Sequence, residues 1–266
     1  MAKSEDDVAA LTRMLSKERL AALVDLTKSE SDAIQLHQET LRVGASLMSI
    51  IATVEIALRN SVCENLTRHF GVANWLRQPP VPFQWRKPEL KKVEAAHDSA
   101  RRAEYAKLTQ AEKHNLESLA YPNGKPPTKS HLDRAKDRRK QIVVSNGKVI
   151  AELTFYFWKR LFGPEYDQLL WRTSLKRTFP YKKLSRAEIA VQLEHIYQAH
   201  NRLAHHEPVL RQRFNETMRA VEFVVSHLET IQPSAETPLA TLLASDIEKV
   251  KNEANDLHAR LDKYKV

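Results

Sequence analysis

The chain has 266 residues, of which 42 are lysine or arginine and 33 are aspartate or glutamate, giving a formal net charge of +9 at pH 7. A chain of this length can bury a full hydrophobic core. The basic balance favours an anionic partner such as nucleic acid, although a basic solvated surface would give the same charge. A single cysteine excludes an intrachain disulfide and is typical of a reducing cytosol, and only five glycines predict long helices with few tight turns.

The first 30 residues predict two short helices. One is expected at 8–15 and another at 17–26, with Ser16 as the N-cap of the second. The opening Met-Ala-Lys-Ser-Glu-Asp-Asp has no apolar core of the kind found in secretory signals, so we expect a cytoplasmic protein.

A long helical pattern follows from 32 to 69. Apolar residues recur there every three or four positions without a proline, and Gly71 follows as a C-terminal stop. The pattern predicts either one very long helix or two helices joined near Gly44. The most apolar window, 43–58, is shorter than the roughly 20 residues that span a bilayer, and it contains Glu55. We therefore expect a buried helix in a soluble protein without membrane contact.

The next part of the chain contains a proline-rich segment, a charged segment and a second segment with prolines. Four prolines between 77 and 88 predict an extended connection, and Pro88 can open the helix that follows. Residues 91–119 predict one charged surface helix, and the prolines and glycine of 121–127 predict a loop.

Basic residues are concentrated between 125 and 148. Eight lysines and arginines stand there against two aspartates, an excess of six. A solvated helix face is one interpretation of such a run. The other is a track for an RNA backbone, with contacts from Arg134, Lys136, Arg138, Arg139 and Lys140.

Two helices are expected between this segment and residue 180. In 149–162, Leu153, Phe157 and Leu161 are spaced by four, which favours a core helix over a platform for stacking bases. A second helix is predicted at 165–177.

The last third of the chain predicts three helices. Ser185 and Glu188 form a capping box that opens a helix running past residue 200. Residues 209–228 predict the last packed helix of the main body. From 243 to 264 apolar residues follow steps of four and three, a heptad seam that predicts a helix docked on the body or paired with a second copy.

Groups that move protons or hold phosphate are most concentrated at 194–208, which reads Glu-His-Ile-Tyr-Gln-Ala-His-Asn-Arg-Leu-Ala-His-His-Glu-Pro. Apolar residues at helical spacing place this run at the end of a helix that the final proline stops. Asn201 and His205 are four apart and share a helix face, whereas His200 and His205 diverge by about 140°.

Metal binding, hydrolysis by a protein nucleophile and RNA cleavage are the three chemistries to compare for this run. Histidine and glutamate are common metal ligands, but the spacing of the histidines in this run is poor for a metal pair on a helix. The sequence also contains no nucleophile motif of a hydrolase. RNA cleavage fits better, because RNA supplies its own nucleophile, the 2′-hydroxyl, and the protein need supply only proton transfer and a cation. His205 lies near a helix C-terminus, where the macrodipole favours a charged imidazole suited to a general acid.

The same run carries a family resemblance. His-Asn-Arg-Leu-Ala-His-His-Glu-Pro at 200–208 resembles the signature of the Abi-like (abortive infection) bacterial proteins of the HEPN superfamily. Val-Glu-Ile-Ala-Leu-Arg-Asn at 54–60 and Glu-Leu-Thr-Phe-Tyr-Phe-Trp at 152–158 resemble two further segments of that family. The main departure is at His200, where the family has arginine.

The resemblance implies an all-α fold, an HEPN-like helical bundle with long helices and a C-terminal heptad-patterned helix. Residues 1–232 would form a single domain, and 233–266 a linker and helical tail. It also implies a metal-independent endoribonuclease without cofactor that acts as a homodimer, in phage defence or as a toxin, with an antitoxin or other regulator as a further partner.

The resemblance also implies roles for individual residues. His205 is expected to be the principal acid and base, with Asn201 as a positioning hydrogen bonder. Phosphate binding would fall to His200, Arg202 or Arg59. Supporting positions would be Glu55, Asn60, His206 and Glu207.

The alternative is a non-catalytic HEPN-like module that binds RNA or a protein and has lost the motif arginine at position 200. The position of Arg59 discriminates between the two. Arg59 beside His205 would favour the enzyme, and Arg59 elsewhere would favour the binding module.

Overall fold

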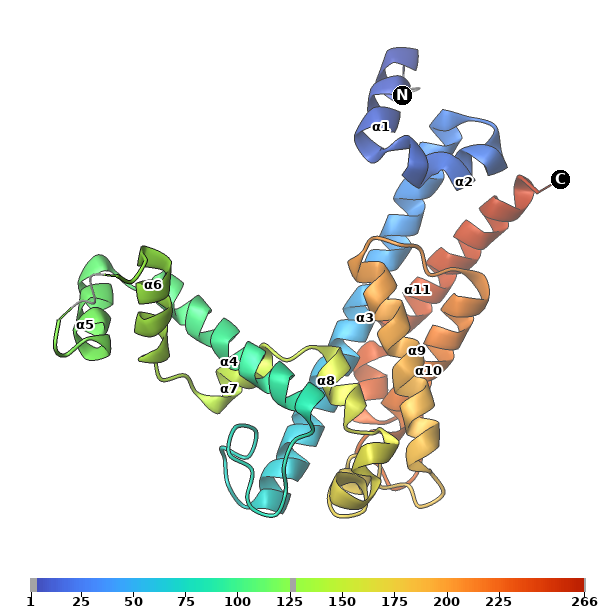
Figure 1. Cartoon of the computed structure of the whole chain (residues 1–266). Helices are drawn as coiled ribbons and strands as arrows, with labels where there is room; N and C mark the ends of the chain where they lie inside the picture. The colour runs from blue at the N-terminus through green and yellow to red at the C-terminus, as the bar shows by residue number, and fades with distance from the viewer. Residues whose placement is uncertain (1–3, 125–127, 266) are drawn as a thin grey trace.

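The computed structural model describes residues 4–124 and 128–265, and within these ranges the chain is helical and contains no strand. The predicted all-α class is confirmed. The fold is organised around α3 (Glu30–Phe70), a single helix of 41 residues that runs through the whole bundle (Figure 1). Ser29 caps its start by accepting a hydrogen bond from the Asp32 amide, and Gly71 ends it in a left-handed conformation.

The two alternatives at Gly44 are resolved in favour of one continuous helix. A Cβ atom at Gly44 would lie 3.1 Å from Leu203 Cδ2 on α9 (Arg186–Ala204), so the missing side chain allows the two helices to approach closely. The glycine therefore marks a helix crossing, and the helix does not break there.

The core of the bundle lies between α3, α9, α10 (Arg211–His227) and α11 (Pro238–Lys263). In Figure 1, α11 runs alongside α3, and α9 slants across it. The apolar stripe of α3 is buried along nearly its whole length, and Ile50, Ile51 and Val54 have no exposed surface. By length and composition alone α3 could cross a membrane, a test that core helices of soluble proteins also pass. Cytoplasmic localisation stays a prediction.

The heptad helix packs on its own chain. Leu243, Val250, Leu257 and Leu261 of α11 are buried, and α11 contacts α3 and α10. Ion pairs flank this seam: Arg260 binds Glu39, Lys251 binds Glu222, and Arg211 lies 2.8 Å from Asp262. Of the two expectations for the tail, the structure shows docking on the body.

Both predicted N-terminal helices are present, as α1 (Glu5–Leu15) and α2 (Lys17–Thr27). The Ser16 side chain caps α2 as predicted, accepting a hydrogen bond from the Arg19 amide. Both helices pack on the start of α3.

An arm made of α4 (Lys87–Lys107), α5 (Gln110–Ala120) and α6 (His131–Lys140) projects from the bundle (Figure 1). The prediction of one helix at 91–119 is wrong. Leu108 is extended, and Thr109 with Glu112 forms a capping box that starts a new helix, so the chain folds back. Lys125 and the rest of the predicted loop at 125–127 lie outside the described residues.

The helix predicted at 149–162 is also wrong, because the chain forms α7 (Asn146–Ala151) and α8 (Phe155–Arg160) with a break between them. Thr154 is extended, with φ of −83° and ψ of 165°, and it precedes the first residue of α8, so the chain leaves the helical conformation between the two helices. The α-helix predicted at 165–177 is instead a series of short 3₁₀ and π turns at Pro164–Tyr166, Asp167–Trp171 and Leu175–Arg177.

The docking of α11 can be tested with two leucines of the same helix, Leu257, which is 2% exposed, and Leu242, which is 66% exposed. Leu257→Ala should lower the free energy of unfolding by about 2 to 5 kcal/mol, because it leaves a cavity, whereas Leu242→Ala should change it by about 0.5 kcal/mol or less. Urea denaturation followed by circular dichroism measures both. Equal effects of the two changes would show that α11 does not pack as described.

Candidate functional site

The predicted motif lies at the end of α9, as expected from its sequence. Ser185 and Glu188 form the predicted capping box at the start of this helix. At its end the Glu207 amide donates to the Arg202 carbonyl at 2.8 Å, and His206 adopts a positive φ of 57°. The chain therefore turns sharply just before Pro208, and the polar residues of the motif spread over three sides of the helix end.

His200 faces α3. Its Nε2 lies 4.0 Å from Oε2 of Glu55, and its Nδ1 is buried without a hydrogen-bond partner among the described residues. Burial raises the pKa of Glu55, although the charges of His200 and Arg59 oppose this shift. The structure thus brings the carboxyl group of Glu55, one of the supporting positions, next to His200.

His200 and Asn201 also line a groove of about 600 Å³ between α4, α8 and α9. The wall contributed by α4 carries Lys91 and Lys92, and α8 and α9 contribute Phe155, Tyr156 and Tyr197. Lys92 Nζ lies 5.6 Å from the centre of the Tyr156 ring, and Lys159 Nζ lies 4.2 Å from the centre of the Tyr197 ring. The groove combines cations, aromatic faces and two motif side chains.

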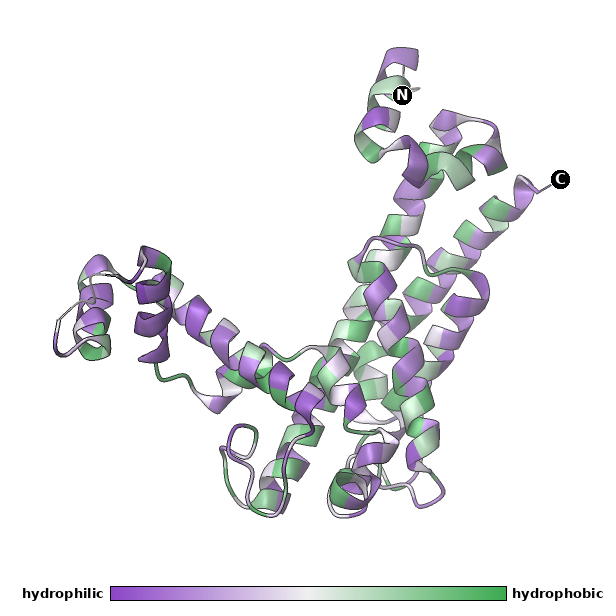
Figure 2. Ribbon diagram, viewed as in Figure 1, coloured by the Kyte–Doolittle hydropathy of each residue, from purple (hydrophilic) through white to green (hydrophobic). Residues whose placement is uncertain are grey.

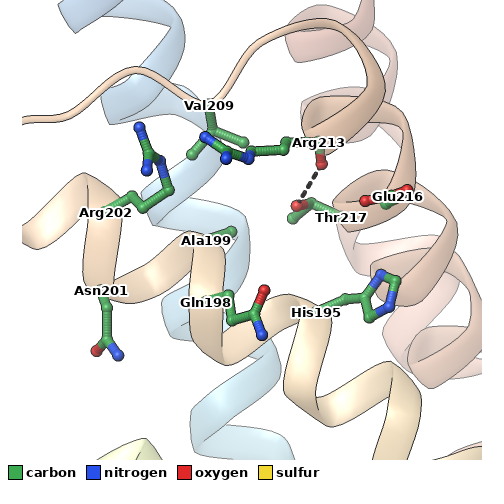
Figure 3. A pocket seen from close by; sticks show the side chains of 9 residues that line it. All are labelled: His195, Gln198, Ala199, Asn201, Arg202, Val209, Arg213, Glu216 and Thr217. Carbon is green, nitrogen blue, oxygen red and sulfur yellow. Dashed lines mark hydrogen bonds between the residues drawn. The ribbon is translucent and has the colours of Figure 1, made fainter.

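Arg202 points to a second hollow of about 290 Å³, between α9 and α10. Figure 3 shows its guanidinium group and that of Arg213 on one side of this hollow, next to Val209. Arg202 lies 3.0 Å from Glu207, whereas the side chain of Arg213 makes no hydrogen bond or ion pair with any residue that the structure describes. Asn201 lines both this hollow and the groove, so it stands on the ridge between them.

His205 is exposed one turn beyond Asn201, and its side chain has no hydrogen-bond partner within the described ranges. His206 and Glu207 line a third, mostly apolar hollow against Gly44 of α3, and the carbonyl of His206 accepts a hydrogen bond from Arg19. The predicted divergence of His200 and His205 is therefore present: His200 faces Glu55, and His205 faces solvent.

Two supporting residues of α3 lie apart from this ridge. Arg59 makes no hydrogen bond or ion pair among the described residues, and its charge acts on Glu55 and Cys63. Asn60 lines a cavity formed with the connection between α10 and α11. The structure thus brings Glu55 to His200 and does not join Arg59 to His205, which is the arrangement that favours the binding alternative.

The basic residues predicted to bind RNA divide into two groups on α6, along which Figure 2 shows mostly hydrophilic residues. Arg134 and Arg138 face α5, 3.4 and 3.9 Å from Glu117, and the Arg138 guanidinium lies 5.6 Å from the centre of the Tyr105 ring. These two cations hold the arm together. The remaining three, Lys136, Arg139 and Lys140, face solvent or α4.

The described side chains offer little support for a metal site or a cysteine nucleophile. Among the residues described, no group of three or more His, Cys, Asp or Glu side chains is arranged to hold a metal ion. Burial raises the pKa of the Cys63 thiol to about 12, so its thiolate is scarcely populated at neutral pH.

Comparison of the chain with protein-family models, with curated proteins and with solved structures found no match.

The sequence prediction missed four residues that build these hollows: Lys91, Lys92, Tyr197 and Arg213. The two lysines belong to the segment 91–119, which predicted a solvated surface helix. Tyr197 belongs to a helix in which only the apolar residues were used to predict a buried face. No local signal marks them, because each acquires its neighbours from an element more than 40 residues away or from the next helix.

Burial of Glu55 generates a pH prediction. Its raised pKa means that folding disfavours the ionised form, so the stability that the protonated carboxyl contributes is lost as the pH rises through the folded pKa. Glu55→Gln should therefore raise the urea midpoint at pH 8, and the gain should vanish below the ordinary value of 4.5, where the carboxyl is protonated in both states. Glu64→Gln, on the exposed side of α3, is the control and should change stability by about 0.5 kcal/mol or less. An unchanged midpoint for Glu55→Gln at pH 8 would contradict the prediction.

Proposed function

We propose that the protein is a metal-independent endoribonuclease that binds single-stranded RNA in the groove between α4, α8 and α9. The observation that carries the proposal is the combination of Lys91, Lys92, Tyr156 and Tyr197 with His200 and Asn201 in one groove. Aromatic faces stack unpaired bases, and lysines neutralise the phosphates between them. An RNA strand lying there passes the ridge that carries Asn201, and His205 is one helical turn further along.

The chemistry follows from the substrate. The 2′-oxygen of the ribose attacks the adjacent phosphorus, the bond from phosphorus to the 5′-oxygen breaks, and the product carries a 2′,3′-cyclic phosphate. One proton leaves the 2′-hydroxyl and another is given to the departing 5′-oxygen. His205 is the candidate for proton transfer, and Asn201 for orienting the phosphate. Lys91, which lines the groove, and Arg202, which lines the second hollow, are candidates for stabilising the negative charge that develops.

The resemblance of 200–208 to the Abi-like signature supports the same activity and extends the proposal to a role in phage defence or as a toxin restrained by an antitoxin. It also supports an HEPN-like identity for the bundle and a cytoplasmic location. These assignments rest on the resemblance, whereas the RNA-binding groove rests on side chains placed together by the fold.

A second candidate function is an RNA-binding module without catalysis. Two observations favour it: position 200 is histidine, and Arg59 makes no contact with His205. This module would use the same groove and the same aromatic and basic side chains, so binding is common to both candidates and cleavage separates them.

The proposed activity can be tested with mixed RNA, a chelator and three variants. Wild type should cleave and leave cyclic phosphate ends, His205→Ala should not cleave, and His114→Ala, an exposed histidine of the arm, should match wild type. His200→Arg should raise the rate by at most about 10² to 10³, because arginine supplies a permanently charged fork of donors for a phosphate.

Cleavage that survives in His205→Ala would refute the assignment of that residue. If wild type binds RNA without cutting it, the non-catalytic module is the function, and circular dichroism of each variant checks that the fold is intact.

We also propose a symmetric homodimer in which the ends of α9 face each other. Within one chain His200 and His205 face different directions, and of the two only His205 is exposed. Cleavage needs two proton transfers, and in the dimer the His205 of each subunit would serve one of them. Light scattering at micromolar concentration should give twice the mass of the chain. A strict monomer that cleaves RNA would refute the proposal.

A further inference from the structure

A cationic hollow lies in the arm, away from the motif at the end of α9. Its volume is about 220 Å³, and α4 and α6 form its walls. The described residues that line it are five basic side chains and one acidic side chain: Asp98, Arg101, Arg102, Lys136, Arg139 and Lys140.

The protein neutralises only part of this charge: Lys136 lies 3.7 Å from Asp133, and Lys140 lies 3.0 Å from Asp137. The side chains of Arg102 and Arg139 make no hydrogen bond or ion pair with any residue in the described ranges. The guanidinium of Arg101 donates from Nε to the carbonyl of Ile142 at 3.2 Å, and its nearest carboxylate, Asp98, is 4.0 Å away. Burial lowers the pKa of Arg101, the charge of Asp98 opposes this shift, and the charge of Arg77 adds to it. Two cations of the hollow, Arg102 and Arg139, are therefore without a carboxylate partner among the described residues.

The opposite side of α6 provides an internal comparison. Arg134 and Arg138 point to α5, where Glu117 and the ring of Tyr105 compensate them. On the side that faces α4, the exposed Lys136 and Lys140 share Asp133 and Asp137, while Arg139 has no such partner among the described residues. The arm thus neutralises the cations that hold it together and leaves Arg102 and Arg139 of the hollow without a carboxylate partner among the described residues.

The hollow and the RNA groove lie on one face of α4. Lys91 and Ala95 line the groove, and Asp98 and Arg102 line the hollow. Their spacing of four, three and four places them on the same side of the helix, and all of them are exposed. Eleven residues of helix separate Lys91 from Arg102 by about 16 Å along the axis, a span of a few nucleotides. A strand leaving the groove along α4 would meet the hollow.

We infer that the hollow between α4 and α6 is a second phosphate-binding site, which holds a backbone phosphate of the RNA strand that lies in the groove. The inference rests on the proposed binding of RNA, but it does not require cleavage. Arginine is suited to this role because its planar fork donates two parallel hydrogen bonds to phosphate oxygens. Binding should then depend on the length of the RNA, because short RNA occupies the groove alone and longer RNA reaches both sites.

The test measures the binding of fluorescein-labelled oligouridine of about 4 and about 12 nucleotides by anisotropy, over a range of salt concentrations. The double variant Arg102→Ala/Arg139→Ala should bind the long RNA about fivefold more weakly at 0.1 M salt, and its salt slope should be lower by about 0.7 for each phosphate that the variant no longer neutralises. Its affinity for the short RNA should equal that of wild type. Lys92→Ala, in the groove, should weaken both RNAs.

Two controls separate the site from a general effect of charge. Lys182→Ala/Lys183→Ala removes the same charge from an exposed turn outside both sites and should leave the length dependence unchanged. Arg102→Lys/Arg139→Lys keeps the charge and should restore most of the affinity for the long RNA. Circular dichroism confirms that each variant is folded.

The outcomes distinguish this inference from the proposed function. Equal binding of long RNA by wild type and the double alanine variant would overturn the second site, whether or not the groove binds RNA. Wild type that binds both RNAs with the expected length dependence but does not cleave would leave the second site standing and refute the nuclease. Calorimetric titration with inorganic phosphate tests whether the hollow binds free phosphate instead of a backbone phosphate of RNA. Phosphate bound by wild type and not by the variant, without any length dependence for RNA, would overturn the assignment to an RNA backbone.

Discussion

The structure depends on the burial of one apolar stripe along a helix of 41 residues, about 60 Å long. A stripe of that length needs partners over its whole extent, and α1 and α2 supply them at its start while α8, α9, α10 and α11 supply the rest. At Gly44 the absence of a side chain allows Leu203 to approach the backbone, and further along the same helix Glu55 meets His200. The packing that stabilises the bundle therefore also positions the polar end of α9 against α3.

Charge is distributed unevenly over this scaffold. Where cations support the fold they have partners, as Arg138 has Glu117 and Arg260 has Glu39. Arg213 and Arg102, which line two of the hollows, have no partner among the described side chains, whereas Arg202 in the first of these hollows is paired with Glu207. Gathering like charges in a concave surface is unfavourable without a counter-ion and focuses the field on an anion that enters. The pattern is the physical basis for treating the hollows as ligand sites.

The end of α9 shows which parts of a site follow from a local pattern. The divergence of His200 and His205 could be predicted, because residues five apart on a helix must point about 140° apart. The sequence did not predict which residue of α3 would face His200, and the structure places Glu55 there, 4.0 Å away. No sequence pattern predicted that Arg202 and Arg213 would line the same hollow. Their proximity depends on the turn at His206, which sets the direction in which α10 packs against α9.

The sequence by itself determined the all-helical class, the helical pattern of 32–69, the capping box of Ser185 and Glu188 and the position of the motif at a helix end, since these depend on residues within one or two turns of each other. Tertiary structure alone decided the rest. The docking of α11 depends on a partner surface some 200 residues earlier in the chain, and the close approach of α3 and α9 at Gly44 depends on Leu203. The break at Leu108, in contrast, has a local signal that the prediction missed, the capping box of Thr109 and Glu112. The groove and the arm hollow likewise combine residues from separate helices. Their chemistry exists only once the chain has folded, because charge and packing act through space and not along the sequence.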